Sequence, residues 1–327
     1  MKITIARLRS GTNYTGTPLL DIMDSFHELF FEYMNKNNKN DYGVYNFGWN
    51  APNRKKLDDI IDADVIVVPS ENEFQWHIKG YRHTNEMQRS NEDVKKIGKY
   101  LKNKHLVIFR SDRADNEELF RKKTFKGFSI GRFSILDEMD IKGGIHAMKY
   151  HFIREIYKPK RKKWDFIYWG CDKRKNADNK SSNDERHLIL KQIKDDAIVR
   201  SYLIGNYSPP RLRDEKIQKM RDLIPTLSSG KSTICFNWLD PYATTSRYHE
   251  SLACGIFPFV WKDYDKKNTI VASKFQRISS VEEFYEKLPE VNERFSEVEN
   301  HYLTRTLKSK DLYYKQFSKK LNTILHY

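Results

Sequence analysis

Short runs of β-branched and aromatic residues alternate with helix-like segments along nearly the whole chain of 327 residues. This alternation is typical of parallel sheets covered by helices, because a chain that returns to a parallel neighbouring strand needs a long crossover. The sequence therefore predicts an α/β protein with two Rossmann-like domains, whose parallel sheets face a central cleft and whose C-terminal helices pack back. The predicted strands lie at 3–6, 65–68, 106–109, 166–168, 199–204, 233–236 and 257–261.

The boundary between the two domains is predicted at 158–163, a run of Lys, Pro and Arg with no apolar residue to anchor it in a core. We expect one domain at 1–157, a second at 164–305, and a C-terminal helix at 306–327 that returns to the first domain. This basic run is either a solvated linker or an additional contact for a phosphate backbone. The apolar residues expected on one face of the C-terminal helix are Leu312, Phe317, Leu321, Ile324 and Leu325.

The chain is strongly basic, with 59 Lys and Arg against 44 Asp and Glu and a net charge of +15. Such a balance favours polyanionic partners. A hydrophobic fraction of 39% excludes a disordered chain. The three cysteines are far apart, so neither a disulfide framework nor a zinc knuckle is indicated. With no leader pattern and no run long enough to span a bilayer, we expect a cytoplasmic protein without a membrane partner.

A glycine, Gly170, follows the strand at 166–168, and two cations, Lys173 and Arg174, come soon after it. A glycine lets the backbone approach a ligand closely, and the cations could neutralise a diphosphate. The next helix is predicted to open at 182–185, which has capping-box spacing, and to carry Arg186 in its first turn. A glycine with nearby cations can also arise by coincidence, so these residues only suggest an anion site.

The most informative segment is 245–261, which predicts a helix of small residues, a terminating glycine at Gly255 and a buried strand. Arg247 and Glu250 are three residues apart and share one face near the start of that helix. They could form a surface ion pair, which is ordinarily worth about 0–1 kcal/mol. Alternatively they face the cleft, with Arg247 on a phosphate and Glu250 accepting hydrogen bonds from ribose hydroxyls.

The segment from Arg247 to Trp261 resembles the nucleotide-sugar-binding segment of GT-B glycosyltransferases, above all the T-even phage DNA glucosyltransferases that glucosylate 5-hydroxymethylcytosine. In that family a glutamate precedes a small-residue stretch and a buried strand, as Glu250 and 253–255 do here. The family's β enzyme has an arginine three residues before that glutamate, where Arg247 stands. Its strand-end Tyr-Gly-Gly is similar to 168–170, although the middle glycine is a tryptophan in this chain.

This resemblance implies a GT-B fold in which the second domain binds a UDP-sugar. Lys173 or Arg174 would contact the diphosphate together with Arg186, the backbone at Ile224 would contact the uracil base, and Gly16 in the loop at 14–17 would face the donor sugar. The UDP-sugar is a co-substrate, so no permanently bound cofactor is expected, and the implied mechanism requires no divalent metal.

In both phage enzymes the strand corresponding to 106–109 ends with an aspartate important to catalysis, the general base of the inverting enzyme, and Asp112 occupies that position here within one residue. A hydroxyl that attacks an anomeric carbon must lose its proton, which a carboxylate can accept. Asp112 is therefore the predicted catalytic residue, with Asp115 as the second candidate. It could instead pair with neighbouring arginines and cap the next helix.

The stretch 95–126 has eleven Lys or Arg and four Asp or Glu, which is a net charge of +7 around Asp112. Affinity for DNA comes largely from neutralised phosphates, although a charged solvent face remains an alternative. Before it, 74–83 interleaves aromatic and basic residues that could stack on or replace an extruded base, or could form a small satellite core. The candidate DNA contacts are Trp76, Arg82, Arg113, Lys122, Lys123 and Lys126.

Three functional hypotheses follow. The first is a monomeric DNA glycosyltransferase that flips the base and moves glucose, or a pentose such as arabinose, from a UDP-sugar to the hydroxymethyl group of 5-hydroxymethylcytosine in duplex DNA; if phage-encoded, it acts in the cytoplasm of the infected host. The second is a GT-B enzyme with a glycan, lipid or small-molecule acceptor. The third is a non-catalytic nucleic-acid-binding protein. Zinc-ligand spacing, GxxxxGK[ST] and GxGxxG motifs are missing from the sequence.

Overall fold

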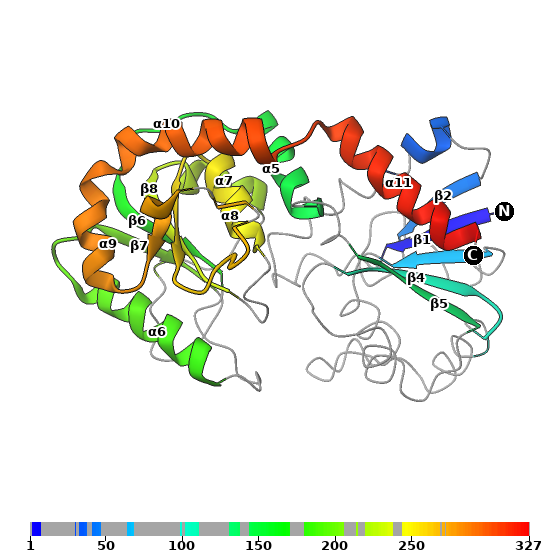
Figure 1. Ribbon diagram of the computed structural model, residues 1–327, viewed down its shortest axis with the longest axis horizontal. Helices are drawn as coiled ribbons and strands as arrows, with labels where there is room; N and C mark the ends of the chain where they lie inside the picture. Colours follow the sequence, from blue (N-terminus) through cyan, green and yellow to red (C-terminus); the bar gives the residue numbers. More distant parts are fainter. Residues whose placement is uncertain are drawn as a thin grey trace. The chain divides into compact units, whose positions relative to one another are not determined.

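The computed structural model contains two compact units (Figure 1). The residues that the structure describes are 2–7, 30, 33–37, 41–46, 64–68, 99, 102–110, 131–137, 144–170, 180–205, 214, 220–237, 244–268, 270–271 and 273–326.

The first unit is built on a five-stranded parallel sheet with the order β2-β1-β3-β4-β5. Its central strands carry β-branched residues, and the described side chains of Val65, Ile66 and Val67 are buried. The order of the strands and their common direction are those of a doubly wound sheet, as the sequence pattern predicts. Its strands are β1 (Lys2–Arg7), β2 (Asp41–Asn46), β3 (Val65–Val68), β4 (His105–Arg110) and β5 (Arg132–Asp137).

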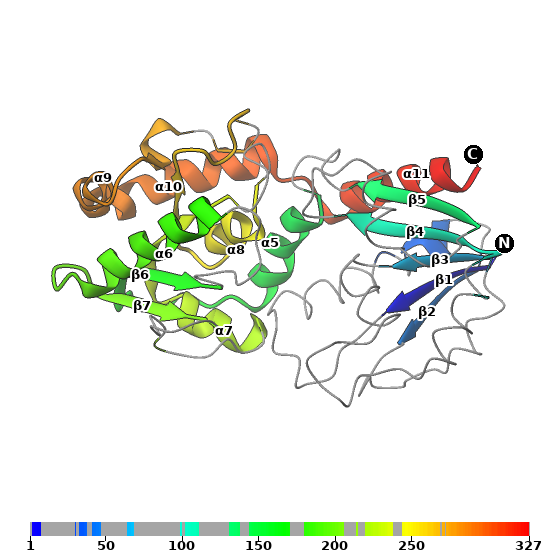
Figure 2. The same ribbon diagram turned by 90° about the horizontal axis from the view of Figure 1, so that it is seen from below.

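The C-terminal helix α11 (Lys310–His326) packs with this first unit from Asp311 onward (Figures 1 and 2). Phe30 is fully buried and its ring lies 6.0 Å from that of Phe317 on α11. Arg132 at the start of β5 donates to the carbonyl of Ile324 over 3.3 Å. Leu312 was expected on the packing face of this helix but is 38% exposed. The buried face of the helix includes Tyr313 and Tyr314 instead of Leu312.

The second unit also contains a five-stranded parallel sheet, with the order β10-β9-β8-β6-β7. Helices connect successive strands from β6 to β9, so this unit has the predicted α/β architecture. Its strands are β6 (Trp164–Trp169), β7 (Ser201–Ile204), β8 (Gly230–Cys235), β9 (Phe257–Trp261) and β10 (Arg277–Ile278). Its helices are α5 (Gly144–Ile156), α6 (Lys180–Asp195), α7 (Met220–Leu227), α8 (Ser246–Ala253), η4 (Lys274–Gln276), α9 (Val281–Lys287), η5 (Leu288–Glu290), α10 (Val291–His301) and the π-helical turn η6 (Tyr302–Thr306).

Aromatic rings fill the core of the second unit. Phe284 of α9 is fully buried and meets Phe166 of β6 and Phe259 of β9 edge to face, with centroid distances of 5.5 and 5.4 Å. Edge-to-face pairs of this kind add about 0.5–1.5 kcal/mol beyond the area they bury. This core packs β6 and β9 against α9.

Two local expectations differ from the structure. The units divide before α5 rather than at 158–163, because α5 packs against α8 and so groups with the second sheet. Helix α6 begins at Lys180, two residues before the predicted capping box at 182–185. Among the described helices, none has the length and apolar character needed to cross a bilayer.

Candidate functional site

The carboxyl end of the second sheet contains a reversal of strand order between β6 and β8. The chain passes from β6 to β7 on one side of the sheet and then to β8 on the other side of β6. In open parallel sheets, ligands bind outside the carboxyl ends of the strands at such a reversal. The residues that stand there are 168–170, which end β6, and 235–237, which end β8.

Gly170 occupies a backbone conformation that a side chain would strain. Its φ is +121°, and a Cβ atom built on it would lie 2.5 Å from Nη2 of Arg247. Its amide donates to the carbonyl of Ile204 over 2.9 Å, and a Cβ on Gly205 would lie 2.5 Å from the Gly170 carbonyl oxygen. The ends of β6 and β7 and the arginine of α8 therefore come together only because these two positions lack side chains.

Arg247 is held against the end of β6. Its Nε and Nη2 atoms both donate to the carbonyl oxygen of Trp169, with the Nε contact at 3.1 Å. Its guanidinium lies 4.2 Å from the centroid of the Tyr168 ring, which adds a cation–π contact. A guanidinium has five N–H donors, of which Trp169 takes two, so the described residues leave three for a ligand.

Glu250 is almost completely buried, with 1% exposure. One carboxylate oxygen, Oε2, accepts a hydrogen bond from the indole N–H of Trp169 over 2.8 Å. The other, Oε1, pairs with the ammonium of Lys149 over 3.4 Å. Arg247 and Glu250 thus contact the same strand-end residue, and the cation paired with Glu250 is Lys149, so the surface ion pair between Arg247 and Glu250 is not the arrangement found.

Helix α8, which carries both residues, is fixed at its two ends. At its start the amide of Thr245 donates to the phenolic oxygen of the buried Tyr264 over 2.7 Å. At its end Gly255 has a φ of +67°, its amide donates to Leu252, and the amide of Ile256 donates to Ser251. These two bonds form a Schellman motif, in which a glycine reverses the chain without steric cost. The predicted helix, glycine and strand are therefore present.

One lysine of the predicted linker has a structural role. The Lys162 ammonium donates to the carbonyl oxygens of Ser228 and Gly230, over 3.1 and 2.8 Å, and to that of Gly255. Burial lowers the pKa of Lys162 to about 8, while the three carbonyl dipoles favour its charged form. Lys162 thus fastens the ends of α7 and α8, while Lys160 and its other cationic neighbours are exposed.

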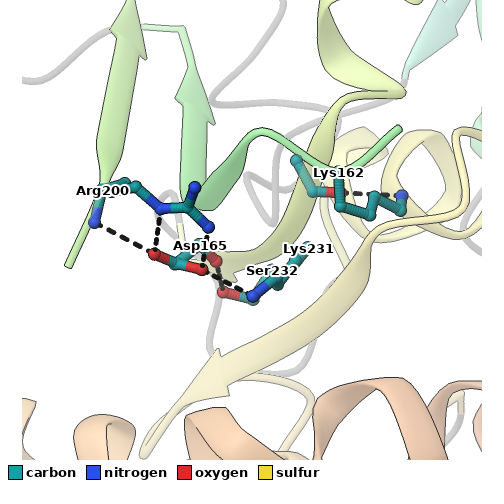
Figure 3. Close-up of polar contacts among 6 residues, drawn as sticks. Lys162, Asp165, Arg200, Lys231 and Ser232 are labelled. Atoms are coloured by element: carbon teal, nitrogen blue, oxygen red, sulfur yellow. Dashed lines mark hydrogen bonds and ion pairs between the residues drawn. The ribbon is translucent and has the colours of Figure 1, made fainter. Parts of the chain in front are cut away.

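A second charged group lies at the opposite, amino end of the sheet (Figure 3). Asp165 accepts hydrogen bonds from the guanidinium of Arg200 at 3.0 and 3.1 Å and from Lys231 at 2.7 Å, and its backbone carbonyl accepts from Ser232. Burial by itself would raise the pKa of Asp165, but the hydrogen bonds from Arg200 and Lys231 lower it to about 2. This group joins β6, β7 and β8 and lies away from the ends where ligands bind.

Two other predicted donor contacts are buried. Arg186 on α6 is 6% exposed. Ile224 on α7 is 2% exposed, and its carbonyl already accepts from the amide and hydroxyl of Ser228, over 2.9 and 2.6 Å. Their roles in donor binding remain predictions.

Several predicted site residues lie outside the described part of the chain. They are the catalytic candidate Asp112, its alternative Asp115, the donor contacts Gly16, Lys173 and Arg174, and the DNA contacts Trp76, Arg82, Arg113, Lys122, Lys123 and Lys126.

Sequence reasoning missed two side chains that the structure brings to Glu250. Trp169 stands where the resemblance implies a glycine, and its indole donates a hydrogen bond to the carboxylate. Lys149 pairs with the other carboxylate oxygen. A signal for it existed, because Lys149 precedes the buried Phe152 and Ile153 by three and four residues and so stands on the apolar face of α5. A lysine in that position needs a buried partner.

The described residues contain no group of three or more His, Cys, Asp or Glu side chains that could hold a metal ion. The two described cysteines, Cys235 and Cys254, are buried free thiols. The chemistry assembled at the end of β6 is therefore that of a guanidinium, a carboxylate and close backbone, which suits a phosphorylated, hydroxylated ligand.

No model of a protein family and no curated protein matches the chain. Solved structures do. A crystal structure of the DNA-modifying enzyme β-glucosyltransferase, with and without uridine diphosphoglucose, matches with a TM-score of 0.62 at 13% identity, over 98% of this chain and 100% of that one. The T4 phage β-glucosyltransferase in complex with UDP and Mn²⁺ matches with a TM-score of 0.62 at 12% identity, over 98% and 100%.

The likeness extends to a second enzyme. An α-glucosyltransferase in complex with UDP and a 13-mer DNA containing an HMU base matches with a TM-score of 0.58 at 9% identity, over 99% of each chain. The chain has the GT-B fold of these glucosyltransferases. At identities of 9–13% this establishes the architecture, and it confirms the predicted α/β class and the resemblance to the phage enzymes at the level of fold.

Proposed function

We propose that the chain is a DNA glycosyltransferase that moves a sugar from a UDP-sugar to the hydroxymethyl group of a 5-hydroxymethylpyrimidine, in the first instance 5-hydroxymethylcytosine, in duplex DNA. The observation that carries the proposal is the joint contact of Arg247 and Glu250 with Trp169, beside Gly170, at the strand reversal of a GT-B fold. These are the residues whose motif resembles the donor segment of the phage enzymes.

The donor half of the proposal follows from the chemistry of these groups. The three free N–H donors of Arg247 match the oxygens of a diphosphate, and charge-assisted hydrogen bonds of this kind are the strong ones. The carboxylate of Glu250 accepts hydrogen bonds from the ribose hydroxyls. Gly170 lets the ligand approach the backbone at the end of β6. Lys173, Arg174 and Arg186 are proposed to complete the diphosphate contacts.

The acceptor half rests on the sequence. Asp112 would take the proton of the hydroxymethyl group as its oxygen attacks the anomeric carbon, and the bond from that carbon to the diphosphate breaks as UDP leaves. The cations around the diphosphate stabilise the charge that develops on it. The basic residues of 95–126 would bind the DNA backbone. Because the target atom is on a base, we propose that the base is flipped out of the duplex.

The nature of the donor sugar and the need for a metal belong to the proposal. Glucose and a pentose such as arabinose are both candidates. One structural neighbour was solved with Mn²⁺, and the described residues of this chain do not group metal ligands. We propose that the protein acts as a monomer. We also propose that its cationic side chains stabilise the departing diphosphate and that the reaction does not depend on a metal.

The test is to incubate the protein with hydroxymethylcytosine DNA and a panel of UDP-sugars, with EDTA or with Mn²⁺, and to identify modified nucleosides by mass spectrometry. A sugar-modified nucleoside that requires both substrates supports the proposal. UDP binding without transfer to DNA would indicate a GT-B enzyme with another acceptor. Duplex binding without UDP binding would indicate a nucleic-acid-binding protein, and either result would refute the proposal.

A further inference from the structure

The charge of Glu250 depends on its neighbours. The residue is 1% exposed, and an ionised carboxylate buried to this degree is strongly destabilising unless a cation or several hydrogen bonds compensate it. An uncompensated carboxyl group would take up a proton and become a poorer acceptor. A useful acceptor for ribose hydroxyls therefore requires a nearby positive charge.

The titratable groups on its own helix do not supply that charge. His249 donates or accepts at Nδ1 to the Tyr302 hydroxyl over 2.7 Å, and burial, followed by the charges of His146 and Lys149, lowers the pKa of His249 well below its ordinary value. Burial raises the pKa of the Cys254 thiol. Both groups are therefore uncharged near neutral pH.

The groups on the other packed elements are few. On α5, His146 stacks on His249 with a centroid distance of 6.4 Å, and Lys149 contacts Glu250 directly. On β8, burial raises the pKa of the Cys235 thiol to about 12. Arg247, which is on the same helix as Glu250, directs its Nε and Nη2 atoms to the Trp169 carbonyl instead of the carboxylate. Within the described residues, Lys149 is the cation in contact with the carboxylate.

We propose that Lys149 is a positioning residue for donor binding: its ammonium on Oε1 and the Trp169 indole on Oε2 together fix the plane of the Glu250 carboxylate toward the ligand. This inference rests on the proposed function, in which Glu250 binds ribose. Lys149 is 1% exposed, and its side chain spans from α5 to α8, which pack side by side (Figure 2).

The carboxylate has hydrogen-bonding capacity for a ligand. A carboxylate offers about four lone-pair directions, of which Trp169 uses one on Oε2 and Lys149 one on Oε1. The described residues leave one direction on each oxygen, which matches the two adjacent hydroxyls of a ribose. Because each oxygen is held by a different side chain, the carboxylate cannot rotate without breaking one of the two contacts.

The experiment measures UDP affinity by calorimetry for the wild type, Lys149→Met, Lys149→Arg, Glu250→Gln and the double variant Lys149→Met/Glu250→Gln. Loss of a charge-assisted contact predicts that Lys149→Met binds UDP about tenfold or more weakly at about pH 6.5.

Three further measurements separate this role from a general loss of structure. In the Glu250→Gln background, Lys149→Met should cause no additional loss, because it acts through a carboxylate that is no longer there. Lys149→Arg should retain most of the affinity. The matched control is Lys191→Met, which removes an exposed lysine of α6 paired with Asp195 and should bind UDP as the wild type does.

The outcomes are distinguishable. If the wild type does not bind UDP, both the proposed function and this role of Lys149 are wrong. If the wild type binds UDP and Lys149→Met binds it equally well, only the role of Lys149 is wrong. An equal loss from Lys149→Met in both backgrounds would also overturn it. Should Lys149→Met fail to fold, the double variant with two neutral partners still decides, since a further loss relative to Glu250→Gln contradicts the proposal.

Discussion

Replacing Gly170 with alanine tests the site most directly. The new methyl group would stand 2.5 Å from Nη2 of Arg247, well inside van der Waals contact. That atom is the end of a flexible side chain, so the guanidinium can move more cheaply than the backbone. We therefore expect Gly170→Ala to displace Arg247 from the carbonyl of Trp169, while the strand β6 stays in place.

The size of the effect has two parts. An alanine held at a φ of +121° costs roughly 1–3 kcal/mol of backbone strain. Loss of the charge-assisted hydrogen bonds from Arg247 to Trp169 costs roughly another 1.5–3 kcal/mol. If the same guanidinium contacts the diphosphate, UDP affinity should fall by about 10- to 100-fold, because each 1.4 kcal/mol is a factor of ten.

Calorimetric UDP titration and urea unfolding of Gly170→Ala, Arg247→Ala and the double variant measure both parts. If the methyl group acts through Arg247, Gly170→Ala should lower UDP affinity in the wild-type background and have little further effect once Arg247 is absent. Urea unfolding should show that Gly170→Ala lowers the free energy of unfolding by the cost of the backbone strain, both in the wild-type background and in the Arg247→Ala background. Wild-type UDP affinity in Gly170→Ala would refute the assignment of Arg247 to the diphosphate.

Three other predictions follow from residues considered above. Asp112→Asn should abolish transfer and leave UDP affinity unchanged, and retained turnover in the nucleoside assay would exclude Asp112 as the base. The pKa of Asp165 is lowered to about 2, so its stabilisation is complete above about pH 4 and is lost as the pH falls toward 2; urea midpoints of Asp165→Asn should lack this acid-dependent loss. Duplex binding should weaken as the salt concentration rises. Replacing Lys122, Lys123 and Lys126 with alanine should reduce the slope of log affinity against log salt concentration by about 0.9 for each phosphate contact that is lost.

The strands that could be predicted are those whose residues signal burial. The runs at 65–68 and 257–261 are continuous apolar segments, and both are strands in the structure. The runs that were missed carry weaker signals. β2 contains a glycine and polar residues, β5 begins with an exposed arginine, and β10 has two residues. Their pairing comes from the neighbouring strand, which a local pattern does not contain.

The candidate site was predictable in part for the same reason. Arg247 and Glu250 are close in sequence, so helical spacing places them on one face. Their partners are distant: Glu250 is 101 residues from Lys149 and 81 from Trp169. The spacing of Arg247 and Glu250 within one helix is compatible with an ion pair between them or with joint contact to a ligand. Tertiary packing of α5 and β6 decides which cation meets the carboxylate, and no local pattern encodes that choice.

The tight junction between α8 and β9 determines the placement of the two donor residues from the far end of their helix. Cys254, Gly255 and Ile256 are the whole connection, and all three amides donate to carbonyls of the helix, so the connection cannot stretch without losing these hydrogen bonds. Inserting one residue into the last helical turn before this connection would shift the preceding residues by about 1.5 Å and turn them by about 100° relative to β9. Glu250 would then lose its contact with the Trp169 indole. Related proteins that keep this chemistry should therefore vary in the lengths of other loops more readily than in the length of this connection.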